Sequence, residues 1–269
     1  MAQDQAQDHI SKKRVLVTLP GMNDVAIRRQ VEYRRSGESA LTLDVYSPPD
    51  AERRGAQGAV VFVTGFPDPG ARRILGCTAN EMASYVSWAQ LVAASGLVAV
   101  TYVNEEPADV HAVFDYLRQQ APALGIDPER IGVWSCSGSG PMGLSVLMQE
   151  GPRPPKCAAL VYPYTLDLGG STGTAAAAKQ WGFANACGGK SVDDFPRDRP
   201  IFVARAGQDQ MPVLNEALDR FVAAALARNL PITVVNHASG PHAFDLFDDS
   251  ETTREVIRQI LAFFCFQLR

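Results

Sequence analysis

The chain has 269 residues, of which 46% are hydrophobic, enough for one large α/β domain with a buried core. Its formal net charge of −4 is small and acidic, which argues against nucleic acid as the main partner. No apolar run reaches the roughly 18 residues that a membrane-spanning helix needs, so no membrane partner is expected either.

The N-terminus and the cysteines indicate the cellular setting. Residues 1–13 are rich in Gln, Asp and Lys and lack the apolar run of a signal peptide, so we expect a disordered tail before a single domain at 14–269. The five cysteines show neither paired nor metal-binding spacing, which favours free thiols in a reducing compartment. We therefore expect a cytoplasmic protein without a bound metal.

The first predicted elements are three strands. Residues 25–33 and 40–46 have the pattern of a hairpin, with Arg35-Ser36-Gly37-Glu38 as its turn. Residues 59–64 form a continuous apolar run, as expected of a strand buried on both faces of a parallel sheet.

From there strands and helices alternate to the C-terminus. Helices are predicted at residues 82–93, 110–117, from 142 onward, at 214–225, and from near Thr252, whose spacing to Glu255 matches a capping box. Strands are predicted at residues 97–103, 131–134, 157–162, 201–206 and 232–235. This alternation predicts an α/β fold with a mostly parallel eight-stranded sheet, an antiparallel N-terminal hairpin and helices on both faces.

One long segment lacks clear periodicity. Residues 163–200 separate two predicted strands, and a stretch this long inside a domain is usually functional. We expect it to form a partial lid, with Trp181 and Phe183 as walls of a substrate pocket. The alternative is a surface excursion without a role in binding.

The segment Ile131–Gly140, IGVWSCSGSG, joins a buried strand to a helix through small residues. Ser137 lies at the apex of the predicted turn, and the small residues Ser135 and Ser139 on either side permit a tight bend. The pattern resembles the nucleophile elbow of the α/β-hydrolases, Gly-x-Ser-x-Gly, with serine at both glycine positions. The alternative is a Gly/Ser-rich loop that only turns the chain.

A serine nucleophile needs a base within hydrogen-bond reach. His242 is favoured because it lies in a Gly-Pro loop after the last predicted strand, and His237 is the alternative. Asp209, just after its own predicted strand, is favoured as the acid that orients the base; it could instead cap the next helix, and Asp167 is the alternative acid. The order Ser137, Asp209, His242 is that of the α/β-hydrolases.

A tetrahedral intermediate needs two donors for its oxyanion. The N–H of Gly138, directly after the predicted nucleophile, is the first. The N–H of Phe66 is the second, because this residue lies in the loop after the strand at 59–64 and the following Pro67 has no N–H. This loop lacks the His-Gly-Gly-Gly run of many lipases and esterases.

Three arginines are candidates for binding a carboxylate of the substrate. Arg72 and Arg73 lie in the loop predicted after the strand at 59–64, and Arg205 lies near Asp209. The alternative is that these side chains are solvated.

From Leu43 to the C-terminus the chain resembles the esterase and dienelactone-hydrolase-like branch of the α/β-hydrolases. The elbow and the stretches Gly125–Trp134, Gly207–Asp209 and Pro241–Asp245 carry this resemblance. It implies hydrolysis of small-molecule carboxylic esters through an acyl-serine, without a cofactor. Dienelactone hydrolases themselves use a cysteine nucleophile, whereas here Cys136 precedes the apex serine, which argues against dienelactone as the substrate.

Two other functions fit the same pattern. A peptidase of the prolyl-oligopeptidase type has this sheet and these catalytic residues, but it usually carries a large extra domain that this chain lacks. A non-catalytic binding protein could also keep the fold. The oligomeric state has no signal in the sequence.

Overall fold

The computed structural model describes residues 9–37, 39–151 and 153–269. Within them, eight strands form one sheet in the order β1-β2-β4-β3-β5-β6-β7-β8. The strands are β1 (Ala26–Ser36), β2 (Ser39–Ser47), β3 (Gln57–Phe62), β4 (Val98–Tyr102), β5 (Ile126–Cys136), β6 (Ala158–Val161), β7 (Ile201–Ala206) and β8 (Ile232–His237). β2 is antiparallel to both of its neighbours, and all other pairs are parallel, which confirms the predicted sheet.

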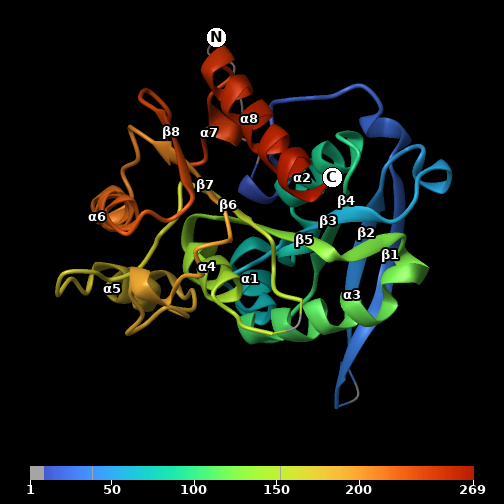
Figure 1. Cartoon of the computed structure of the whole chain (residues 1–269), viewed down its shortest axis with the longest axis horizontal. Helices are drawn as coiled ribbons and strands as arrows, with labels where there is room; N and C mark the ends of the chain where they lie inside the picture. The colour runs from blue at the N-terminus through green and yellow to red at the C-terminus, as the bar shows by residue number, and fades with distance from the viewer. Residues whose placement is uncertain (1–8, 38, 152) are drawn as a thin grey trace, which may run out of the picture.

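Helices cover both faces of this sheet, as predicted (Figure 1). The α-helices are α1 (Asp68–Leu75), α2 (Ala83–Ala94), α3 (Val110–Leu124), α4 (Gly140–Leu147), α5 (Gly173–Trp181), α6 (Leu214–Ala227), α7 (Phe244–Phe247) and α8 (Glu251–Leu268). Side chains of α3, α4 and α6 pack on one face, and those of α2 and α8 pack on the other. No helix in the described chain combines the length and apolarity needed to cross a membrane.

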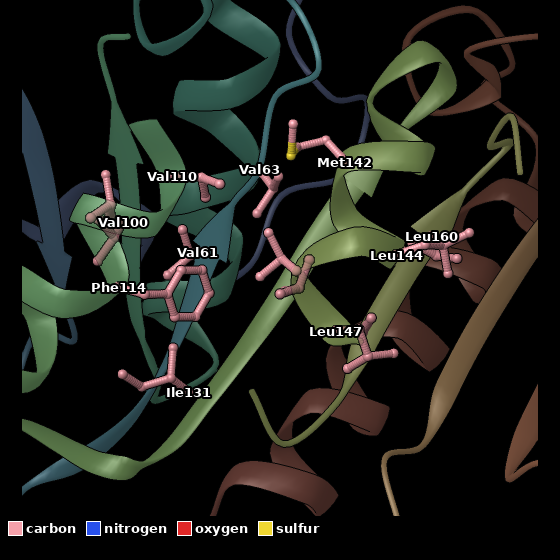
Figure 2. Packing of buried hydrophobic residues seen from close by; sticks show 14 of the residues in the cluster. Val61, Val63, Val100, Val110, Phe114, Ile131, Met142, Leu144, Leu147 and Leu160 are labelled. Atoms are coloured by element: carbon pink, nitrogen blue, oxygen red, sulfur yellow. The ribbon is translucent and has the colours of Figure 1, made fainter. Parts of the chain in front are cut away.

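The central strand β3 shows why its sequence is apolar at every position. Val61 belongs to the hydrophobic cluster on one face, while Val60 and Phe62 belong to the cluster on the other, because successive side chains of a strand point in opposite directions. Figure 2 shows the first cluster, in which Val61 packs with Val100 of β4 and Phe114 of α3. The continuous run is therefore buried on both faces, as predicted.

Most of the predicted tail, residues 1–13, lies outside the described residues. Residues 1–8 are outside them, as is Glu38 of the predicted hairpin turn. In the remaining part, Ile10–Lys12 forms one turn of 3-10 helix, and the partly buried Ile10 packs against the cluster that includes α2 and α8. Val15 and Val17, which follow the predicted tail, are buried in the same cluster.

The strand order reverses direction at β3, which lies between β4 and β5. In open α/β sheets such a point forms a crevice at the carboxyl ends of the strands. The loop after β3 consequently lies against the turn after β5: a Cβ atom at Gly65 would lie only 2.7 Å from the carbonyl oxygen of Gly138. The predicted site residues fall at this edge of the sheet.

Candidate active site

Ser137 lies at the sharp turn between β5 and α4, so the predicted strand, turn and helix are all present. Its φ angle is 50°, a left-handed conformation that non-glycine residues rarely adopt. Backbone strain of this kind concentrates at functional sites because the surrounding structure must hold it in place. The serine remains partly exposed.

The neighbouring residues make room for, or bond to, the two serines that occupy the glycine positions of the elbow. The Ser139 hydroxyl accepts the N–H of Gly65 at 3.0 Å, which joins the elbow to the loop after β3. Ser135 is fully buried and lies against Gly143 of α4, where an added Cβ would collide with Ser135 Oγ and lie 3.0 Å from its Cβ. The space that the usual first glycine leaves is thus provided by Gly143.

This contact predicts that Gly143→Ala changes the free energy of unfolding in opposite directions in the wild-type protein and in a Ser135→Gly background. The collision in Gly143→Ala should cost about 1–3 kcal/mol, and alanine should return about 1 kcal/mol of helix propensity, so the substitution should destabilise the protein. In a Ser135→Gly background the collision is removed, and the same substitution should stabilise it. Urea unfolding of the four proteins tests this, and equal effects in the two backgrounds would contradict it.

Three predicted residues form a continuous hydrogen-bonded series. Ser137 Oγ and His242 Nε2 lie 3.0 Å apart, and His242 Nδ1 lies 2.6 Å from Oδ2 of Asp209. The Asp209 side chain is fully buried, and its Oδ1 accepts the N–H of Met211 at 2.9 Å, so both oxygens are held. The His242 side chain is 27% exposed. Loops after β5, β7 and β8 therefore bring hydroxyl, imidazole and carboxylate together.

The alternative candidates have other partners. His237, the last residue of β8, is fully buried and its Nε2 lies 2.8 Å from the carboxylate of Asp248. Asp167 accepts two backbone N–H groups in the first turn of α5, both at 2.8 Å. Asp209 does not cap the next helix, because α6 begins at Leu214.

The predicted oxyanion donors lie close together but differ in their bonding. Gly138 directly follows Ser137, and a Cβ at Gly138 would lie 2.8 Å from Phe66 Cζ. The Phe66 N–H already donates to Thr64 Oγ1 at 3.2 Å. A substrate oxyanion must therefore share this donor with the threonine or displace it.

A buried polar pair that sequence reasoning missed holds the loop after β3. Asn104 follows β4; its Nδ2 donates to the carbonyl of Phe66 at 3.2 Å, and its Oδ1 accepts the N–H of Asp68 at 2.9 Å. The Asp68 side chain accepts the N–H groups of Ala79 and Asn104 at 2.9 and 2.8 Å. Burial raises the pKa of Asp68, and these donors oppose the rise. The available signal was the position of Asn104 just past a predicted strand.

An apolar cluster from the long segment covers one side of the elbow. Phe183 is 5% exposed, and its ring centroid lies 5.1 Å from that of Tyr164 and 5.9 Å from that of Phe66. A Cβ at Gly138 would lie 2.6 Å from Phe183 Cδ1, so Phe183 borders the site. The buried cluster contains Tyr164, Ala177, Ala178, Phe183 and Leu214. Trp181 instead lies at the end of α5 and is 46% exposed.

The three arginines predicted to bind a substrate carboxylate lie in two other environments. Arg72 and Arg73 lie exposed in α1, where a loop was expected; a proline in the first turn is compatible with this helix. Arg205 forms a bidentate pair with Asp219 of α6, at 2.7 and 2.9 Å. Its guanidinium is therefore already engaged.

The sheet order, the helices on both faces and the sharp turn after β5 define the α/β-hydrolase fold. No family model and no curated protein sequence matches the chain, but solved structures do. A bacterial heroin esterase aligns with a TM-score of 0.69 and 16% identity, over 94% of this chain and 87% of that one. Esterase B from Lactobacillus rhamnosis aligns with a TM-score of 0.68 and 16% identity, over 91% and 86%. The propionate-bound esterase Est2 of Thermogutta terrifontis aligns with 0.63 and 18%, over 92% and 97%. These similarities establish a shared fold.

Proposed function

We propose that the protein is a serine hydrolase that cleaves small carboxylic esters through an acyl-serine intermediate. The observation that carries this proposal is the hydrogen-bonded series from Ser137 through His242 to Asp209. The structural neighbours named above are esterases, which supports ester hydrolysis as the reaction.

Each of the three residues has a defined role in this reaction. His242 Nε2 accepts the proton of the Ser137 hydroxyl as Oγ attacks the ester carbonyl. The buried carboxylate of Asp209 accepts the Nδ1–H, which keeps Nε2 free and stabilises the imidazolium. His242 then returns the proton to the leaving alkoxide. In the second half, the same imidazole activates a water that releases the acid from Ser137.

The surroundings favour serine over cysteine as the nucleophile. Burial of the Cys136 thiol, with a contribution from the charge of Asp245, raises its pKa well above the ordinary range. A thiol that stays protonated is a poor nucleophile. On this ground we propose a serine nucleophile; the dienelactone-hydrolase-like branch is proposed from the sequence resemblance alone.

The substrate side of the proposal rests on the apolar walls. The rings of Phe66 and Phe183 lie against Gly138, so apolar side chains border the proposed nucleophile on this side. We propose that the segment 163–200, which carries Phe183, acts as a partial lid. We propose a cytoplasmic location because the five cysteines, each within the described ranges, are free thiols.

A fluorophosphonate probe tests the proposal directly. We expect the intact protein to be labelled and mass spectrometry to place the adduct on Ser137. We further expect hydrolysis of p-nitrophenyl esters but not of aminoacyl p-nitroanilides, which a prolyl-oligopeptidase-like enzyme would cleave. Absence of labelling in a folded protein would favour a non-catalytic binding protein.

A further inference from the structure

A second polar network lies near His242 and is separate from the hydrogen-bonded series. Asp245, in α7, is 1% exposed. Its Oδ2 accepts the Nε1–H of Trp88 at 2.7 Å, and its Oδ1 accepts the hydroxyl of Tyr162 at 2.6 Å. Its backbone carbonyl accepts the N–H of Leu16 at 3.0 Å. Burying a carboxylate is costly even when it is hydrogen-bonded, so a role beyond stability is indicated.

Tyr162 links this carboxylate to the imidazole. It directly follows β6 and has a φ angle of 39°, a conformation that costs on the order of 1–3 kcal/mol for a non-glycine residue. Its ring centroid lies 4.9 Å from that of His242 and 5.3 Å from that of Phe244. A strained residue is thus held by its hydroxyl at one end and contacts the imidazole with its ring.

We propose that Asp245 and Tyr162 are positioning residues for His242. The carboxylate holds the phenol through its hydroxyl, and the phenol ring holds the imidazole so that Nε2 faces Ser137. This inference rests on the proposed function, because it concerns how the general base of that reaction, His242, is held in place.

The titratable neighbours of Asp245 stay neutral near physiological pH. Burial raises the pKa of the Tyr85 and Tyr162 phenols well above the ordinary value. Burial of the Cys136 thiol raises its pKa in the same direction. None of these three groups therefore changes charge in a neutral assay.

Two carboxylates lie near the imidazole, and they differ in how they reach it. The Asp245 oxygens bond to Tyr162 and Trp88, so this carboxylate is linked to His242 through the Tyr162 ring. Burial raises the pKa of Asp245, while the hydrogen bonds from Tyr162 and Trp88 oppose the rise. Asp209, bonded to Nδ1, is the direct partner and remains in place when Asp245 is changed.

Two near-isosteric variants test the proposal. Asp245→Asn should lower kcat/KM for a p-nitrophenyl ester by about 10- to 100-fold, chiefly through kcat, because the base is misplaced. KM should stay close to the wild-type value, because neither residue is placed in the substrate pocket. Tyr162→Phe keeps the ring and should lower kcat by about 3- to 10-fold.

Asp248→Asn is the matched control. Asp248 bonds to His237 and Thr253 in the same part of the chain but outside this network. Its loss should lower the unfolding temperature and leave kcat and KM within error of wild type. An equal fall of kcat in Asp248→Asn would overturn the proposal. So would wild-type kinetics in folded Asp245→Asn and Tyr162→Phe.

A readout that needs no turnover separates this inference from the proposed function. The His242 Cε1–H signal, assigned with His242→Gln, reports by NMR how the imidazole lies against the Tyr162 ring, and its chemical shift should change in Asp245→Asn but not in Asp248→Asn. If wild type neither labels nor hydrolyses esters, the proposed function fails, while an unchanged chemical shift in Asp245→Asn overturns the inference. If Asp245→Asn does not fold, wild-type kcat and chemical shift in Tyr162→Phe overturn it.

Discussion

Ser137→Ala should lower kcat/KM for p-nitrophenyl esters by about 10⁴-fold or more. In the proposed mechanism the hydroxyl supplies both the attacking oxygen and the proton that His242 accepts. The three residues then act as a unit, so the remaining two cannot compensate. Steady-state kinetics with p-nitrophenyl acetate measures the loss, and thermal unfolding confirms that the variant is folded.

Cys136→Ala is the matched control for this substitution. The cysteine is the adjacent residue and carries the alternative nucleophilic atom of the elbow. It should retain activity, because its thiol stays protonated. Near-wild-type turnover in Ser137→Ala, or abolished turnover in Cys136→Ala, would show that the nucleophile is misassigned.

Asp209→Asn should lower kcat by about 10³- to 10⁴-fold with little change in KM. The amide has nearly the same shape but can donate to Nδ1 of His242, which favours the tautomer that carries its proton on Nε2. That tautomer cannot accept the proton of Ser137. Kinetics at saturating ester, with circular dichroism as the folding check, measures the effect.

Asp167→Asn provides the same chemical change at a position away from the imidazole. Asp167 accepts two backbone N–H groups of α5, at Thr174 and Ala175. Its kcat should stay within about 3-fold of wild type, since a helix cap affects stability by about 1 kcal/mol rather than chemistry. A larger loss in Asp167→Asn than in Asp209→Asn would assign the acid to Asp167.

All eight strands were predicted, most of them because they are short apolar runs or alternating segments between turn residues. The start of β5 was not: the strand begins at Ile126 rather than Ile131, and its first part is polar. The residue that caps the start of α8 was harder to predict. Thr252 and Glu255 predict a helix start near residue 252, but α8 begins at Glu251, where Ser250 accepts the N–H of Thr253. Several hydroxyl residues compete for the capping position here. Thr253 bonds instead to His237, and no local pattern predicts this tertiary bond.

The proximity of the three site residues was predictable because each follows its own parallel strand, and these ends meet at one edge of the sheet. Side-chain partners that come from distant segments could not be predicted in this way. Arg205 was a candidate anion contact, but Asp219 of α6 engages it. The bond between Tyr162 and Asp245 joins residues 83 positions apart, which no local pattern reveals.

The contact between Ser135 and Gly143 changes how such elbows are to be recognised in sequences. The usual first glycine meets a requirement for free volume, and here a glycine six residues after Ser137 meets it instead. A search motif restricted to Gly-x-Ser-x-Gly overlooks chains of this kind. A motif that admits serine before the nucleophile should in return demand glycine on the inner surface of the following helix.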